Sequence, residues 1–497
     1  MENRFNLVDE SWIPVADVGR VSLWQLFSSS SYRGLGGNPV QKIALTKLLL
    51  AIAQAANTPT DEQAWRELGA DGLAGSCLAY LDRWHERFYL YGERPFLQMP
   101  AIAAAALQSY GAVSPEVSTG NTTVLSQIQM QRDLDDAEKA LLLVTLMAFA
   151  LAGKKTDNSV VLSPGYPGKR NDKGKPSSSK PGPAVAHLGL LHSFPMGGSL
   201  HETLWLNVLD ASRIAENKGF PQGVGVAPWE LMPEGEDCGV AQNLKQSLMG
   251  RLVPLCRFCL LTDAGLHYSE GLAHPGYKEG VCDPSVAVNS SGKEPKALWV
   301  DPEKRPWREL TALLGFIEQS GSSGFESLQI RAALGRLGGV AGDFAIWSGG
   351  LRVSSNAGEQ YASGSDDFVE SLLWLNRHVL GEGWFAQLKL EMKGLDELAR
   401  KLYGAVLAFF KAQKMDGAKV AAQATQLFWQ LCERDSQTLI DSCDQNASCA
   451  ERRKQLRRSF SHYQHQTYDR FCASETARQF EHWVACRPNN SQYLKED

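Results

Sequence analysis

Helical periodicity that continues to the end of the chain is the feature that most limits its fold. From Asp366 onward, apolar residues recur at the three- to four-residue spacing of a helix face. Short polar or glycine-containing breaks divide this region into four stretches, near 366–380, 384–414, 417–443 and 449–486. Long amphipathic helices with short connections favour an antiparallel bundle. We therefore expect an all-α helical bundle, most simply a four-helix bundle, over residues 366–497.

The preceding 365 residues show mixed patterns. Helical faces are predicted over Val40–Ala56 and Gly72–Arg87, and a buried helix over Asp135–Ala152. A short opening strand precedes them, and strand-like segments with turns continue to about residue 300. A chain of 497 residues also exceeds one ordinary hydrophobic core. We expect an α+β domain over residues 1–365.

Composition indicates a globular protein, with 43% hydrophobic and 21% charged residues. The net charge of −5 argues against a protein coated with nucleic acid, but it allows a local basic patch. The first residues lack a signal-peptide pattern, and the most apolar run, Leu141–Ala152, is too short to span a bilayer. These features predict a cytoplasmic protein that does not contact a membrane.

Ten cysteines in such a chain are expected to be reduced thiols. The pair Cys256 and Cys259 allows a zinc site, with Cys238 and Cys282 as further ligands. Because the pair lies in an apolar run, 252–261, we favour buried thiols on a strand. The remaining candidates are scattered over predicted helices and are not expected to bind metal: Cys432, Cys443, Cys449, Cys472 and Cys486.

No compact catalytic signature is present in the sequence. It contains no phosphate-binding Walker loop, no Gly-x-Ser-x-Gly elbow and no His-Glu-x-x-His motif. His462 and His465 lie one helical turn apart, on what we interpret as a solvated helix face. Asp366 and Asp367 are better explained as caps of a helix N-terminus than as paired catalytic carboxylates. We expect no enzymatic activity, no catalytic residue, no metal and no cofactor.

The segment Gly153–Pro183 is unusually basic, with seven Lys or Arg residues against two Asp residues. It is also rich in proline, glycine and serine, which predicts an exposed loop. It could be a solvated insertion. Alternatively, its glycines could let the backbone approach a DNA duplex while its basic side chains neutralise phosphates.

Two short stretches near the N-terminus place aromatic residues and a proline beside charged residues. They are Phe5-Asn-Leu-Val-Asp-Glu-Ser-Trp-Ile-Pro-Val15 and Phe88-Tyr-Leu-Tyr-Gly-Glu-Arg-Pro-Phe-Leu-Gln98. Such a composition fixes a backbone path rather than a reaction centre. In this order, the two stretches resemble the CasA family, the large subunit of the type I-E CRISPR surveillance complex Cascade. The resemblance implies a non-catalytic subunit that examines DNA beside a target before the guide RNA pairs.

The resemblance also implies residues that read the protospacer-adjacent motif (PAM) in the minor groove. In the family, a glycine-containing loop that follows a buried helix makes this contact, and here the basic segment follows the predicted buried helix. The candidates are Gly153, Lys154, Lys155, Gly165, Gly168, Lys169 and Arg170. A family lysine that enters the groove is matched by Lys278, for which an ordinary exposed lysine is the alternative.

A third family device is a hairpin wedge that parts the first base pairs beside the PAM. Its Gly-Gly frame matches Gly349-Gly350, where we expect a break after an apolar run. Its tip, which bears a glutamine in the family, corresponds to Ser354, Ser355 and Asn356, with Ser355 at the glutamine position or Asn356 after a one-residue shift. A hairpin that only links sheet to bundle is the alternative. The loop that contacts the guide RNA and backbone subunits in the family is matched by Gly120, Asn121, Thr122 and Leu125.

Basic residues on the C-terminal helices, Arg452, Arg453 and Arg457, are candidates for contacts with the displaced DNA strand. A solvated helix face is the alternative. The partners implied by the resemblance are double-stranded DNA, the guide RNA, the other Cascade subunits and a helicase–nuclease recruited after R-loop formation. Two rival functions remain at this point: a metal-dependent hydrolase that uses cysteine or histidine ligands, and a scaffold without DNA contact.

Overall fold

Two units make up the chain in the computed structural model, which describes residues 3–114, 133–149, 160, 187–317, 324–336, 343–353 and 368–495. The first unit contains Met1–Pro302 and Ser323–Leu372, and the second contains Glu303–Ser322 and Leu373–Asp497. A segment from the middle of the sequence, 303–322, therefore belongs with the C-terminal helices, which the pattern along the sequence does not reveal.

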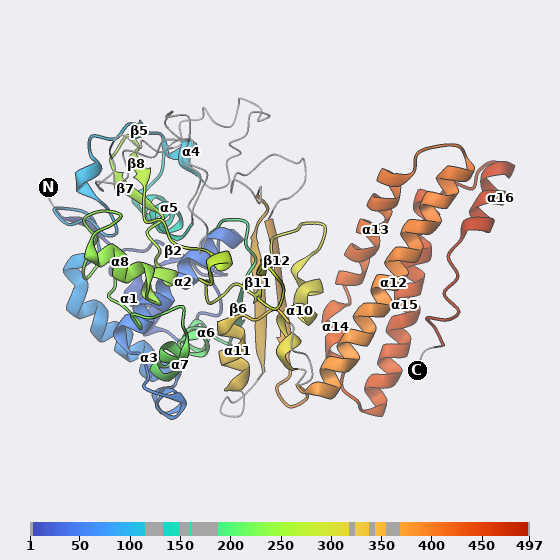
Figure 1. Ribbon diagram of the computed structural model, residues 1–497, viewed down its shortest axis with the longest axis horizontal. Helices are drawn as coiled ribbons and strands as arrows, with labels where there is room; N and C mark the ends of the chain where they lie inside the picture. The colour runs from blue at the N-terminus through green and yellow to red at the C-terminus, as the bar shows by residue number, and fades with distance from the viewer. Residues whose placement is uncertain are drawn as a thin grey trace. The chain divides into compact units, whose positions relative to one another are not determined.

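The first unit combines short helices with small antiparallel sheets (Figure 1). Its helices are α1 (Leu23–Ser28), α2 (Pro39–Ala56), α3 (Glu62–Trp84), α4 (Tyr110–Val113), α5 (Asp136–Ala148), α6 (Leu200–Asn207), α7 (Ala211–Glu216), α8 (Gly239–Lys245), α9 (Met249–Leu252) and α11 (Leu328–Gly335), with 3₁₀ turns η1 (His85–Arg87), η2 (Pro100–Ile102) and η3 (Tyr277–Glu279). Its strands are β1 (Arg4–Asn6), β2 (Ile13–Val15), β3 (Gly19–Val21), β4 (Tyr89–Tyr91), β5 (Leu107–Gln108), β6 (His192–Met196), β7 (Arg257–Leu261), β8 (Leu266–Glu270), β9 (Val288–Asn289), β10 (Lys296–Ala297), β11 (Phe344–Leu351) and β12 (Phe368–Leu375), the last of which continues into the second unit.

Helix α2 forms the centre of the first unit and confirms the predicted helix at Val40–Ala56. It begins at a capping box in which the side chains of Asn38 and Gln41 each bind the other's backbone N–H. Most of its side chains are buried. Helix α5 confirms the predicted buried helix but ends at Ala148. Helix α3 begins at Glu62 but is interrupted at Gly69, whose φ of 63° is not helical, so the helix predicted from Gly72 corresponds to its second part.

A three-stranded sheet in the order β12–β11–β6 positions the candidate site. Strand β6 pairs antiparallel with β11, so that His192 lies opposite Gly349 and Met196 lies opposite Ala345. Two predictions are wrong here. The glycine pair does not break the run, because β11 continues through it to Leu351, and the predicted helix at 366–380 is strand β12.

The second unit is helical, which confirms the predicted order of an α+β region followed by a helical region. Its elements are η4 (Pro306–Glu309), α10 (Leu310–Leu313), η5 (Gly315–Ile317), α12 (Glu382–Ala412), α13 (Ala418–Glu433), α14 (Ser436–Asp441), α15 (Ala447–Phe471) and α16 (Ala477–Cys486). Helices α12, α13 and α15 pack side by side, as Figure 1 shows. Their apolar faces carry the core, including Leu395, Leu402 and Phe428, which are fully buried. Among the described residues, no helix combines the length and apolar character needed to cross a bilayer.

Candidate nucleic-acid interface

Strand β6 contacts the Lys278 turn and described residues that border the basic segment and the predicted wedge. Besides its pairing with β11, its first residue, His192, forms an isolated bridge with Val286, which follows the turn that carries Lys278. The backbone N–H of Ser193 also donates to the carbonyl of Ser285 at 2.8 Å. The sheet therefore links the lysine turn to the strand that leads toward the predicted wedge.

The basic segment is flanked by residues that pack at the same place. Its candidate residues lie outside the described part of the chain: Gly153, Lys154, Lys155, Gly165, Gly168, Lys169 and Arg170. On one side, the Phe149 ring meets the His192 ring edge to face, with 5.9 Å between centroids. On the other side, Gly189 packs so closely that an added Cβ would lie 2.5 Å from Val353. The described residues on the two sides of the segment thus pack on His192 of β6 and on Val353, two residues after the end of β11.

Lys278 lies on η3, a turn with defined geometry. The Glu279 side chain accepts a 2.8 Å hydrogen bond from the N–H of Gly276, and Gly280 closes the turn in the left-handed region, at φ 80°. The Lys278 side chain is exposed, while the neighbouring Tyr277 packs against an apolar cluster. That cluster consists of Leu190, Val286, Val288 and Ala297. The exposed Lys278 side chain therefore extends from a turn whose backbone is fixed by the packing of Tyr277.

A buried polar network holds this base in place. The Asp283 carboxylate accepts hydrogen bonds from the Lys47 ammonium at 2.5 Å and the Ser285 hydroxyl at 2.6 Å. The Ser285 hydroxyl in turn lies 2.8 Å from Nδ1 of His192. Burial alone would raise the pKa of Asp283, but the Lys47 charge and the hydrogen bonds hold that pKa below its usual value. Burial lowers the pKa of His192 to about 4, so the imidazole is neutral near pH 7.

This network was not predicted from the sequence. Lys47 stands within the apolar run of α2, and an ionisable residue in an otherwise buried helix was the available signal. Its partner, Asp283, lies 236 residues away, so no local pattern could identify the pair.

Gly349 and Gly350 are fully buried within β11 rather than placed at a hairpin tip. An added Cβ at Gly349 would lie 2.7 Å from the Trp347 ring, and one at Gly350 would lie 2.6 Å from Val300. The glycines therefore allow close packing in the strand that leads to the predicted wedge. The wedge residues themselves, Ser354, Ser355 and Asn356, lie outside the described residues.

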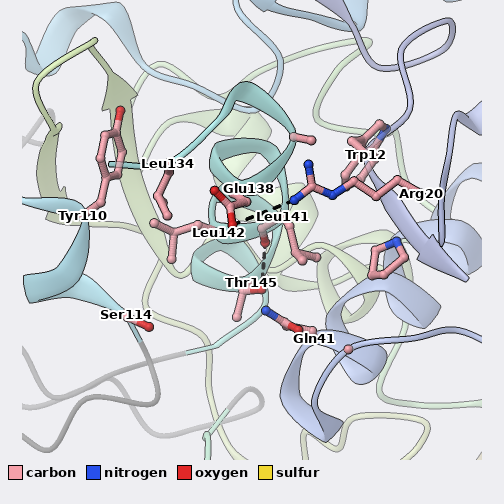
Figure 2. A pocket seen from close by; sticks show the side chains of 13 residues that line it. Trp12, Arg20, Gln41, Tyr110, Ser114, Leu134, Glu138, Leu141, Leu142 and Thr145 are labelled. Carbon is pink, nitrogen blue, oxygen red and sulfur yellow. Dashed lines mark hydrogen bonds and ion pairs between the residues drawn. The ribbon is translucent and has the colours of Figure 1, made fainter. Parts of the chain in front are cut away.

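The predicted guide-RNA loop also lies outside the described residues, at Gly120, Asn121, Thr122 and Leu125. The residues that flank it, Ser114 and Leu134, both line a pocket of about 200 Å³ in the first unit, shown in Figure 2. Arg20 forms part of its rim, where it pairs with Asp135 at 2.6 Å and Glu138 at 3.8 Å. Described residues on both sides of the predicted loop thus line one pocket.

The two N-terminal stretches serve the core of the first unit. The Trp12 indole N–H donates to the carbonyl of Leu7 at 3.0 Å, and Trp12 also lines the pocket at the loop base. In the second stretch, Phe88 stacks on Phe96 with 5.0 Å between ring centroids, and both rings pack on Trp229. Their aromatic content therefore fixes backbone paths, as the sequence indicated.

Two of the three basic candidates in the second unit have structural roles. Arg457 is buried and donates to the Glu391 carboxylate from Nε at 3.1 Å and Nη2 at 2.7 Å. Arg453 donates to the carbonyls of Ser442 and Asp444, which caps the end of α14 and the connection that follows it. We therefore withdraw Arg453 and Arg457 as displaced-strand contacts, because their guanidinium groups hold the bundle together. Arg452 is exposed and remains a candidate.

The cysteines are free thiols. Cys256 and Cys259 are buried, and Cys259 lies on β7, which confirms the prediction of buried thiols on a strand. Burial raises the pKa of Cys256 to about 12, and it also raises the pKa of Cys259. Within the described ranges, no group of three or more His, Cys, Asp or Glu residues is arranged to hold a metal ion.

Comparison with solved structures shows that the fold is shared over nearly the whole chain. CasA from Thermus thermophilus superposes with a TM-score of 0.73 at 20% identity, covering 97% of this chain and 98% of that one. Cse1 from Thermobifida fusca gives a TM-score of 0.73 at 19% identity, covering 99% and 97%. A chain of a CRISPR RNA-guided surveillance complex gives 0.68 at 15% identity, covering all of both chains.

Sequence comparison gives the family directly. A curated relative from Thermus thermophilus, the CRISPR-associated protein CasA/Cse1, is 28% identical over 337 residues, which span 63% of this chain and 60% of the relative. The sequence model of the family described as CRISPR-associated protein Cse1 matches residues 6–467. Since this match covers most of the sequence, the chain belongs to the Cse1 family of CRISPR-associated proteins.

Proposed function

We propose that this protein is the non-catalytic DNA-recognition subunit of a type I-E CRISPR surveillance complex. In this role it binds the PAM in duplex DNA, helps to part the first base pairs so that an R-loop can form, and recruits a helicase–nuclease. Its other partners are the guide RNA and the remaining Cascade subunits. Family membership supports this assignment, and so does the shared fold with a chain of an RNA-guided surveillance complex.

The observation that carries the proposal is the position of the described residues that border three predicted DNA-contacting segments. Phe149, before the basic segment, contacts His192 of β6, and Gly189, after that segment, packs on Val353, the last described residue before the predicted wedge. The Lys278 turn is joined to β6 through Ser285, and β11 pairs with β6. These positions support contact with a single duplex, because strand separation must begin beside the bound motif.

The test is the salt dependence of duplex binding by the assembled complex. A variant in which Lys154, Lys155, Lys169 and Arg170 are replaced by Ala should bind a PAM-containing duplex more weakly. Each lost phosphate contact should lower the slope of log K against log salt by about 0.9. The matched control replaces four exposed lysines of the second unit, Lys393, Lys401, Lys411 and Lys419, by Ala. An unchanged slope for the first variant would show that the basic segment is only a solvated insertion, and the absence of any salt-dependent duplex binding would favour a scaffold without DNA contact.

Lys278 is tested separately, because it is proposed to enter the minor groove rather than to bind a phosphate. Lys278→Ala should reduce the preference for a PAM-containing duplex over one without a PAM. Loss of affinity for both duplexes to the same extent would assign Lys278 a phosphate contact instead.

The wedge proposal is tested by replacing Ser354, Ser355 and Asn356 with Gly. PAM binding should persist while R-loop formation slows, and the defect should largely vanish on a target whose base pairs beside the PAM are already open. Equal slowing on both targets would make the hairpin structural and would make Gln360 the next wedge candidate.

A further inference from the structure

Trp374 is a large aromatic residue displayed on an edge strand. It lies on β12, at the edge of the order β12–β11–β6, and its side chain is 42% exposed. Its neighbours Leu373 and Leu375 are buried, so the alternation of the strand directs the indole to the solvent side. A single exposed aromatic residue is ordinary in itself. Two features of its surroundings distinguish Trp374.

The first feature is a side chain that takes the place of a neighbouring strand. The backbone N–H of Trp374 donates to Oε1 of Gln437 at 2.9 Å, and its carbonyl accepts from Nε2 of the same amide at 2.9 Å. Nε2 also donates to the Asp441 carboxylate at 2.8 Å, which fixes the orientation of the amide. The backbone beneath the exposed indole is therefore already held in place, so stacking on the ring requires little further ordering of the protein backbone.

The second feature is a turn that places basic groups directly after the strand. The Asn376 side chain accepts from the N–H of His378 at 2.9 Å, and the Asn376 carbonyl accepts from the N–H of Val379 at 3.2 Å. Arg377 Nε donates to Nε2 of His378 at 3.2 Å, so the other ring nitrogen of a neutral His378 is a donor. Arg377 supplies a positive charge three residues from the indole.

We propose that Trp374 is a stacking platform for an unpaired DNA base, with Arg377 and His378 binding the adjacent phosphate. An aromatic face beside a cation is the combination that binds single strands without regard to sequence. The inference rests on the proposed function, since a subunit that opens duplex DNA meets unpaired bases. It adds a contact in the second unit that neither PAM binding nor the wedge requires.

The direct test is photo-crosslinking of the full-length protein to an oligodeoxythymidine that contains 5-iodouracil. Mass spectrometry should place the adduct on Trp374. In a binding titration with the same oligonucleotide, Trp374→Ala should weaken binding by roughly tenfold, the effect expected when one base loses its aromatic partner. Trp374→Phe should restore most of the affinity. The matched control is Trp24→Ala, which removes a 55% exposed tryptophan from the first unit and should leave binding unchanged.

The outcomes separate this inference from the proposed function. Trp374→Ala should leave binding of a closed PAM-containing duplex unchanged, whereas the lysine variants described above should impair it. Unchanged single-strand binding with no adduct at Trp374 would overturn the inference and leave PAM binding untouched. Failure of Trp374→Ala to join the assembled complex, with single-strand binding intact, would overturn it in favour of a protein partner on this surface.

Discussion

The two units bury charged groups in different ways. In the first unit, Lys47 pairs with Asp283 across 236 residues of sequence, and Arg336 pairs with Asp210 across 126. In the second unit, the buried pair Arg457–Glu391 joins helices that pack side by side. The first unit therefore depends on polar contacts between distant segments, whereas the bundle depends mainly on apolar faces of successive helices. The predictions below test this difference, starting from the largest expected effect.

Asp283→Ala should lower the free energy of unfolding of the first unit by about 3–5 kcal/mol, because it leaves the buried Lys47 ammonium without its partner. The shift in the denaturant midpoint measures this effect. The control is Glu326→Ala, which breaks an exposed ion pair with Arg331 and should cost at most about 1 kcal/mol. Equal losses of unfolding free energy in the two variants would show that the buried Lys47–Asp283 pair stabilises the first unit no more than an exposed ion pair does.

Trp307→Ala should destabilise the second unit by about 3 kcal/mol. Trp307 is 3% exposed, and its ring packs 5.9 Å from that of Trp429, over which Arg308 also lies at 3.7 Å. Thermal unfolding followed by circular dichroism measures the loss of helix stability. A loss of this size would show that the stability of the bundle also depends on a segment distant in sequence, 303–322. The two units would then differ less in their dependence on long-range contacts. If Trp307→Ala lowers the melting temperature no more than Trp24→Ala does, the segment 303–322 is not needed for the stability of the bundle.

Gly350→Ala should cost about 1–3 kcal/mol, since the new methyl group would collide with Val300 and approach the carbonyl of Leu190. Gly75→Ala is the opposite case: this exposed helical glycine has nothing within 4 Å of an added Cβ, so alanine should stabilise α3 by up to about 1 kcal/mol. Melting temperatures compare the two. We expect Gly350→Ala to lower the melting temperature and Gly75→Ala to raise it. An unchanged melting temperature for Gly350→Ala would show that the backbone of β11 shifts to accommodate the methyl group.

The stability of the first unit should fall as the pH drops from about 6.5 toward 4. Burial lowers the pKa of His192 to about 4 and that of His274 to about 3. The unfolded chain therefore takes up protons in this range while the folded chain does not, which costs about 1.4 kcal/mol per pH unit for each histidine. Denaturation measured across this window checks the slope. His192→Gln should remove the contribution of one proton, so that the slope falls by about 1.4 kcal/mol per pH unit. An unaltered slope would show that His192 does not contribute to the pH dependence of stability.

The bundle was largely predictable because its signal is local. The spacing of apolar residues placed α12 within two residues of its observed ends, since a helix face repeats within one segment. The same pattern failed at β12, where Leu372, Leu373, Trp374 and Leu375 are all apolar. Such a run hides the alternation of two exposed and two buried side chains, and it permits either a helix or a strand.

The candidate site was only partly predictable. The resemblance selected segments such as the Lys278 turn and the Gly349–Gly350 pair, but it could not show that they meet. Strand β6, which joins them, reads His-Ser-Phe-Pro-Met and carries no periodic signal of its own. Its position follows from long-range pairing with β11 and from the network through Ser285, neither of which has a local pattern.

The packing of Phe149 and Gly189 has a consequence for how sequence changes in the basic segment affect the protein. Phe149 contacts His192 of β6, and Gly189 packs on Val353 and Trp299, so the described residues on both sides of the segment have contacts of their own. Those contacts do not depend on the length or charge of the residues between them, and doubling the length of a flexible loop costs only about 0.6 kcal/mol in closure entropy. We therefore expect insertions and charge changes in the basic segment to alter DNA binding more than the stability of the first unit.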